Sequence, residues 1–193
     1  MNQIKLNELK LKAFTEQDVL DYCLLNNINP DNIIILDLSK NELTDISGIK
    51  LFKNTEELYL DYNKLTDISV LNNLKNLKTL CIGKNQIKDI LIIKNLKFLE
   101  FLKLNNGELT DISVLKDLNK LENLYIGNND IKDIFILQYL KNLKRLSITD
   151  LELESDQIQY IELLKNLDML LCKNGFKDMS VLNNLNKNIR IIK

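Results

Sequence analysis

One apolar pattern recurs at a fixed interval through most of the sequence and constrains the possible folds more than any other feature. Cutting the chain at this interval from Ile33 gives blocks that repeat the same pattern. The blocks are 33–54, 55–76, 77–98, 99–120, 121–142, 143–166 and 167–188; the sixth carries two extra residues, and the seventh is out of step in its middle. Because one such block cannot bury its own apolar face, blocks of this length must stack along one axis.

Columns of apolar residues recur at positions 4, 6, 11 and 20 of the blocks. Position 4 is leucine throughout: Leu36, Leu58, Leu80, Leu102, Leu124, Leu146 and Leu170. The other columns hold leucine, isoleucine or phenylalanine, with Cys172 in the position 6 column of the last block. Each fully buried leucine contributes roughly 1.5–3 kcal/mol. The columns therefore predict one continuous core that passes through all the repeats.

Each block opens with alternating polar and apolar residues, as in 57–61, which is typical of a strand. Strands of successive blocks are expected to pair side by side. An aspartate follows in the second half of the block, a residue type that caps helices. It recurs as Asp45, Asp67, Asp89, Asp111, Asp133 and, with a shift, Asp178. We therefore expect a short helix or 3₁₀ turn after each aspartate, on the opposite side from the strands.

An asparagine column at position 9 is the polar counterpart of the leucine columns. It contains Asn41, Asn63, Asn85 and Asn129. An asparagine that points inward satisfies backbone groups that no sheet hydrogen bond reaches. Gly107, Leu151 and Gly175 interrupt the column. We therefore expect the C-terminal third to be less regular.

The two ends do not fit the repeating pattern. In residues 1–32, Thr15 and Asp18 form a helix-start signal, and Val19, Leu20, Cys23 and Leu24 follow at helical spacing. This segment is interpreted as an N-terminal helical cap over the core, with a partner-binding helix as the alternative. Residues 189–193 predict a terminal strand that is either a minimal cap or the place where two copies meet.

The blocks resemble the leucine-rich repeats of pattern LxxLxLxxNxLxDIxxLxxLxx. They are similar to those of bacterial internalins and of the leucine-rich-repeat regulatory subunit of protein phosphatase type 1, and the resemblance covers residues 33–188. It implies an α/β fold: a right-handed leucine-rich-repeat solenoid with a parallel concave β-sheet and short helices or 3₁₀ turns on the convex side. The resemblance also implies that the concave sheet binds a protein partner.

Alternation along each strand predicts which side chains face outward from that sheet. Positions 4 and 6 point to the core, so positions 3, 5 and 7 point away from it. Aromatic residues are enriched where partners bind. The predicted partner-binding residues are Tyr59, Tyr62, Phe101, Lys103, Tyr125, Asp37, Asp61 and Arg145. Acidic residues lie toward the N-terminal side of this face and basic residues farther along. Cys81 is expected to point outward with an unreactive thiol.

Composition excludes several other classes of function. The net charge of −1 argues against nucleic-acid binding, and the absence of histidine removes the commonest general base and metal ligand. The three cysteines form no CxxC pair, and no apolar stretch is long enough for a membrane helix. We expect no catalytic residue, metal, cofactor or small-molecule substrate.

The predicted function is therefore a cytoplasmic, non-catalytic protein-protein interaction module, monomeric rather than dimeric. The alternatives are a regulatory subunit that targets or inhibits an enzyme such as a phosphatase, and a surface adhesin of internalin type.

Overall fold

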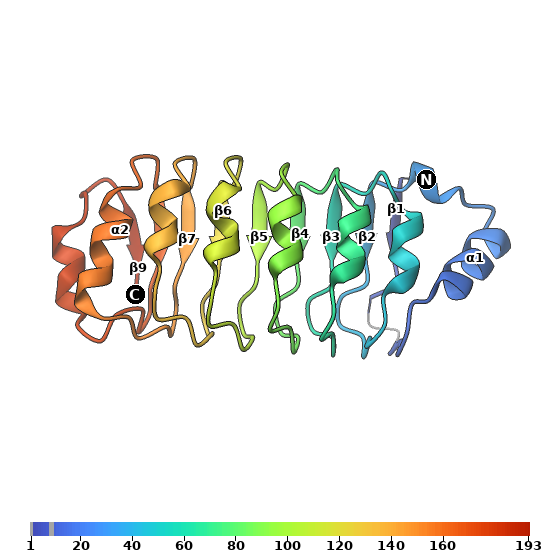
Figure 1. Ribbon diagram of the computed structural model, residues 1–193, viewed down its shortest axis with the longest axis horizontal. Coiled ribbons are helices and arrows are strands. Elements are labelled where there is room, and N and C mark those ends of the chain that lie inside the picture. Colours follow the sequence, from blue (N-terminus) through green and yellow to red (C-terminus); the bar gives the residue numbers. More distant parts are fainter. Residues whose placement is uncertain (1, 8–9) are drawn as a thin grey trace.

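The computed structural model describes residues 2–7 and 10–193. In this part of the chain, nine short strands form one sheet in chain order, and each strand is parallel to the next (Figure 1). The strands are β1 (Gln3–Lys5), β2 (Ile35–Asp37), β3 (Glu57–Tyr59), β4 (Thr79–Cys81), β5 (Phe101–Lys103), β6 (Asn123–Tyr125), β7 (Arg145–Ser147), β8 (Met169–Leu171) and β9 (Arg190–Ile192). From β2 to β8 they occupy positions 3 to 5 of the seven blocks.

The register of the sheet confirms the columns predicted from the sequence. Leu36 pairs with Leu58, Leu58 with Leu80, and the same column continues to Leu170 on β8. Every leucine of this column has 0% of its surface exposed. Stacking therefore buries one unbroken row of leucines along the length of the molecule, the solenoid fold that the sequence predicted.

Short helices line the side of the stack opposite the strands (Figure 1). Most are 3₁₀ helices: Ser47–Leu51, Ser69–Asn73, Leu91–Asn95, Ser113–Asp117, Phe135–Tyr139 and Met179–Asn184. The predicted aspartates begin them, since the carboxylate of Asp45 accepts a hydrogen bond from the backbone N–H of Ser47 at 2.7 Å. Asp67, Asp89, Asp111, Asp133 and Asp178 make the same contact two residues ahead. The helix prediction is confirmed.

The sixth block differs because its two extra residues lengthen the helical side. A 3₁₀ helix at Ser155–Gln157 continues directly into α2 (Ile158–Glu162). Ile158 and Ile161 of α2 are buried in the core. The insertion thus replaces a single 3₁₀ turn without breaking the stack.

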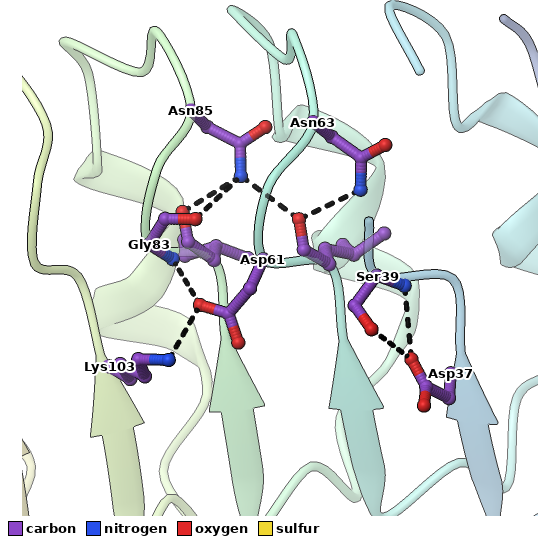
Figure 2. A network of polar contacts seen from close by, with 9 residues as sticks. Asp37, Ser39, Asp61, Asn63, Gly83, Asn85 and Lys103 are labelled. Atoms are coloured by element: carbon purple, nitrogen blue, oxygen red, sulfur yellow. Dashed lines mark hydrogen bonds and ion pairs between the residues drawn. The ribbon is translucent and has the colours of Figure 1, made fainter. Parts of the chain in front are cut away.

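The asparagine column forms the predicted ladder, of which Figure 2 shows Asn63 and Asn85. Asn63 Nδ2 donates to the carbonyl oxygens of Leu38 at 3.0 Å and Leu60 at 2.9 Å, while its Oδ1 accepts from the N–H of Leu43 at 3.0 Å. Asn41, Asn85 and Asn129 repeat this pattern. Where Gly107 replaces asparagine, a cavity of about 10 Å³ lies beside Ile82 and Leu109. The ladder is thus interrupted at that repeat.

The N-terminal segment contributes a strand that the sequence analysis did not predict. β1 pairs with β2, and its Ile4 stands in register with Leu36. After β1, α1 (Glu16–Leu25) begins at Thr15 with the expected capping box. A short 3₁₀ helix at Pro30–Asn32 then leads into β2. The interval in sequence from Ile4 to Leu36 is longer than the interval from Leu36 to Leu58, so the period of the blocks does not reveal β1.

The C-terminal segment ends in a strand, as predicted. β9 pairs with β8, and Ile191 stands in register with Leu170. In the part of the chain that the structure describes, no helix combines the length and the apolar character needed to cross a bilayer.

Candidate interaction surface

The face of the sheet opposite the helices presents the side chains at positions 3, 5 and 7 of each repeat. We call it the sheet face. The register places the position 5 residues in one row across the strands: Asp37, Tyr59, Cys81, Lys103, Tyr125, Ser147 and Leu171. Because neighbouring strands lie about 4.8 Å apart, Tyr59 and Tyr125 are separated by roughly 14 Å. Backbone hydrogen bonds between strands hold this row on a fixed frame.

Phe101 and Tyr125 form an aromatic pair on this face. Their ring centroids are 5.2 Å apart, with an angle of 32° between the ring planes. Both side chains are partly exposed. An aromatic pair of this kind presents a rigid apolar surface at little conformational cost. The structure therefore brings together two of the residues predicted for partner binding.

Tyr59 lies in the same row as Tyr125 but interacts with an acidic neighbour. Its hydroxyl donates to Glu57 Oε2 at 2.7 Å. Burial, followed by this hydrogen bond, raises the pKa of the Tyr59 hydroxyl. Tyr59 is therefore a neutral, oriented side chain whose ring forms part of the surface.

Asp61 is buried, unlike the other predicted partner-binding residues. Only 8% of its surface is exposed, and its Oδ1 accepts from the N–H of Gly83 at 2.9 Å (Figure 2). The Nζ of Lys103 lies 3.3 Å from the same oxygen. Burial raises the pKa of Asp61, and the charge of Lys103 opposes that shift. Asp61 thus fixes Lys103 across the sheet rather than standing free for a partner.

Gly83 is required for this arrangement. A Cβ at this position would lie 2.7 Å from the backbone oxygen of Asn105 and 3.0 Å from Asp61 Oδ1. Any larger residue would push the loops of adjacent repeats apart. The close approach of backbone to carboxylate therefore depends on the missing side chain.

Cys81 lies in the outward-facing row, as predicted, but it is buried there. Only 5% of its surface is exposed. Its neighbours in the row are Tyr59 and Lys103, whose long side chains are large enough to cover a small thiol. Burial, with a further contribution from the Asp61 charge, raises the pKa of the Cys81 thiol to about 12. The thiol therefore stays protonated and forms the floor of the surface.

Tyr62 lies at the rim of the sheet face, in the loop after β3. Its backbone has a φ of 59°, a left-handed conformation that is unfavourable for a bulky residue. The residue is 47% exposed, and Lys84 Nζ lies 4.5 Å from the centroid of its ring. A large aromatic side chain is thus maintained at a position where the backbone favours glycine or asparagine.

The remaining two predicted residues lie toward opposite ends of the sheet. Asp37 accepts hydrogen bonds from the backbone N–H of Ser39 at 3.0 Å and from its hydroxyl at 2.6 Å (Figure 2). Arg145 is exposed on β7, and its Nη1 lies 3.5 Å from Asn123 Oδ1. The predicted change from acidic to basic character is weakened in the middle of the face, because Lys103 is paired with Asp61.

Sequence reasoning missed a residue that extends this basic end. Arg190 stands in register with Met169 on the neighbouring strand, and Met169 with Arg145. These three residues line a hollow of about 410 Å³ together with Lys144, Glu122, Asn123 and Asp168. The period alone would not have identified Arg190, because counting 22 residues on from Met169 gives Ile191, whereas the sheet register pairs Met169 with Arg190, 21 residues on.

The chemistry of the sheet face follows from its accessible side chains. Within residues 2–7 and 10–193, no three histidine, cysteine, aspartate or glutamate side chains form a group suited to a metal ion. The buried carboxylate is held by Gly83 and Lys103, and the buried thiol is protonated. What remains accessible is a set of aromatic, acidic and basic side chains on a rigid sheet.

Comparisons with known proteins agree with this architecture. A family model described as leucine-rich repeats (2 copies) matches residues 53–95. No curated protein matches the sequence.

Among solved structures, an internalin (inlF) of Listeria monocytogenes superimposes with a TM-score of 0.84 and 28% identity, and internalin C2 of the same organism with 0.84 and 29%. Both alignments cover 100% of this chain; they span 54% of inlF and 80% of internalin C2. A leucine-rich-repeat protein of Leptospira interrogans aligns over 99% of this chain and 48% of its own, with a TM-score of 0.79 and 25% identity. By its repeats, its sheet register and these likenesses, the chain is a leucine-rich-repeat protein that resembles internalins.

Proposed function

We propose that this chain is a non-catalytic protein-protein interaction module that binds a partner protein through the sheet face. The observation that carries the proposal is that Tyr125 stands next to Lys103 in the position 5 row and forms an aromatic pair with Phe101. Aromatic and basic side chains on a preorganised surface are the features that concentrate binding energy at protein interfaces. The leucine-rich-repeat fold, which commonly serves protein recognition, supports the same function.

The partner's contact surface follows from the accessible residues. An apolar ridge on the partner would pack against Tyr59, Phe101 and Tyr125. A basic group on the partner would pair with Asp37 at one end of the sheet face. Arg145 and Arg190 at the other end suit an acidic group. A partner with an apolar centre and charges of opposite sign at its two ends would therefore bind in one orientation.

The test uses the full chain as bait in extracts of its native cell, with captured proteins identified by mass spectrometry. The captured partner is then titrated by calorimetry against the wild type and the Tyr59→Ala, Tyr125→Ala double variant. Loss of two interface aromatics is expected to weaken binding by about tenfold or more.

A matched control variant is Tyr139→Ala combined with Phe98→Ala. Both residues are 46% exposed and lie outside the sheet face. This variant should bind as the wild type does. Equal affinity of the wild type and the tyrosine double variant would reject the sheet face as the binding surface.

A second candidate function is a surface adhesin of internalin type, favoured by 28% and 29% identity with two internalins. Mild protease treatment of intact native cells distinguishes it from an intracellular interaction module. Degradation of the protein on intact cells would support the adhesin, whereas protection until the cells are lysed would support a cytoplasmic module.

A further inference from the structure

α1 lies at the N-terminal end of the stack (Figure 1). It has two apolar faces, and only one of them packs against the protein. Val19 and Cys23 are buried, with 0% and 5% of their surfaces exposed. They close the core beside the 3₁₀ helix Ser47–Leu51, as the cap interpretation requires. Leu24 and Leu25 are 84% and 86% exposed. The apolar stripe read from the sequence therefore divides into a capping half and an unpartnered half.

The unpartnered half is one connected surface. Residues three and four apart lie side by side on a helix. Leu20, which is 47% exposed, is therefore beside Leu24, and Asp21 is beside both Leu24 and Leu25. Gln17 Nε2 donates to Asp21 Oδ1 at 2.7 Å. We call this group, Gln17, Leu20, Asp21, Leu24 and Leu25, the outer face of α1: leucines around one carboxylate.

These leucines contribute nothing to covering the core. A single exposed leucine is ordinary on a protein surface, but adjacent ones on one helix mark a contact surface. Burying them requires another molecule, because no other element of the described chain covers them.

The charges of the residues around this face indicate which kind of molecule binds it. No lysine or arginine occurs between Lys12 and Lys40, whereas the segment includes Glu16, Asp18, Asp21 and Asp31. Glu16 is paired with Lys50 at 2.6 Å, and Asp18 is held by Thr15 in the capping box. On the outer face of α1, the Asp21 carboxylate accepts a hydrogen bond from the neutral amide of Gln17 and is not paired with a cation of that face. It is therefore the carboxylate that a bound cation would meet.

The same charges disfavour two other occupants. If a second copy bound through the same face, the two-fold symmetry of such an interface would bring the Asp21 carboxylates of the two copies close together. An anionic lipid surface would be repelled by the acidic segment and attract no compensating lysine. A partner with apolar side chains around a positive charge has neither disadvantage.

We propose that the outer face of α1 binds an amphipathic helix of a partner protein, one that carries lysine or arginine beside its apolar stripe. Such a helix lays apolar residues spaced three and four apart against Leu20, Leu24 and Leu25. Its cation pairs with Asp21. This second surface lies at one end of the stack, so it operates independently of the sheet face.

The test uses fluorescence anisotropy with the full chain and three synthetic helical peptides. The peptides share one leucine stripe and differ only in its flanking residues: lysine, serine or glutamate. The lysine peptide is expected to bind about tenfold or more tightly than the glutamate peptide. The Leu24→Gln, Leu25→Gln double variant should weaken lysine-peptide binding by about tenfold or more, and its melting temperature should stay unchanged because glutamine preserves helix propensity.

Charge reversal and two controls complete the design. Asp21→Lys should reverse the order of the peptides, so that the glutamate peptide binds best. Leu91→Gln, at a leucine that is 50% exposed on a different helix, should bind the lysine peptide as the wild type does. The Tyr59→Ala, Tyr125→Ala variant should do the same, which separates this proposal from the sheet-face function.

Three results would overturn the proposal. The first is equal binding of the three peptides, or binding of none. The second is a dimer seen by light scattering that the Leu24→Gln, Leu25→Gln variant dissociates, which would assign the face to a second copy. The third is binding to vesicles of phosphatidylcholine and phosphatidylglycerol that the same variant abolishes, which would assign it to a membrane.

Discussion

Restoring the missing asparagine at Gly107 should stabilise the protein by completing the ladder. Asn129 donates to the carbonyl oxygens of Leu104 and Ile126 at 3.1 and 2.8 Å and accepts from the N–H of Leu109 at 3.2 Å. The same sequence offsets place an asparagine at 107 within reach of the Ile82 and Leu104 carbonyl oxygens and the Ile87 N–H. The cavity of about 10 Å³ at this site, roughly the space of one water, gives the amide room to enter.

The expected gain follows from three contributions. Each buried hydrogen bond contributes about 0.5–1.5 kcal/mol net. Replacing glycine removes about 0.4–1 kcal/mol of unfolded-state entropy. Against this, a Cβ at position 107 would lie 2.9 Å from Asn129 Oδ1, so that side chain must shift. We expect Gly107→Asn to raise the free energy of unfolding by about 1–2 kcal/mol, which corresponds to a rise of about 2–8 °C in melting temperature.

Thermal and urea unfolding followed by circular dichroism measure this change, with Gly107→Ala as the matched control. The alanine variant has the same Cβ contact and the same entropy gain but no amide. The difference in the free energy of unfolding between the two variants therefore measures the contribution of the ladder hydrogen bonds. Slower hydrogen exchange at the Ile87 amide should accompany the asparagine. If Gly107→Asn is no more stable than Gly107→Ala, the ladder hydrogen bonds do not stabilise the repeats and the reasoning is wrong.

Three further predictions concern single side chains. Leu102→Asp should prevent folding, because it places a carboxylate in a fully buried column; a wild-type melting curve would contradict the register. Tyr62→Asn should raise the free energy of unfolding, measured by urea titration, by about 0.5–1 kcal/mol. Asparagine relieves the strain of the left-handed backbone, about 1–2 kcal/mol, and this gain exceeds the loss of the contact with Lys84, about 0.5–1 kcal/mol. A less stable variant would refute this prediction. Cys81 should react with a thiol reagent at pH 8 about tenfold or more slowly in the native protein than in denaturant, since its pKa is raised to about 12. Equally fast labelling in the native and denatured protein would show that the Cys81 thiol is accessible. Because the folded-state pKa of Cys81 lies above the ordinary value of 9.0, the stabilisation from the protonated thiol is present below pH 9 and decreases as pH rises toward 12.

The repeats were predictable from sequence because their physical cause is periodic. A leucine such as Leu102 must be buried in every repeat, so its column stays visible without an alignment. The capping aspartates repeat for a similar reason, since each begins a helix at the same point of its block. β1 was not predictable in this way, because α1 and its flanking loops separate Ile4 from Leu36 by more than the length of one block.

The candidate surface was only partly predictable. Alternation along a strand gives the direction of a side chain, but it does not show which neighbours cover it. Cys81 and Asp61 were both assigned to the outward face, yet each is less than a tenth exposed. Both are covered through contacts between repeats, and for Asp61 these include Gly83 and Lys103. Contacts of that kind depend on side-chain lengths in adjacent strands, which a period does not encode.

The unbroken parallel register from β1 to β9 has an evolutionary consequence. Core residues and surface residues occupy separate positions of the same short strand, so a change at position 5 leaves the buried leucine at position 4 in place. Under the proposed function, partner preference is therefore free to diverge one side chain at a time while the scaffold persists. The exceptions are sites such as Gly83, which contacts both Asn105 of the adjacent repeat and the Asp61 that holds Lys103, and a change there requires coordinated substitutions in adjacent repeats.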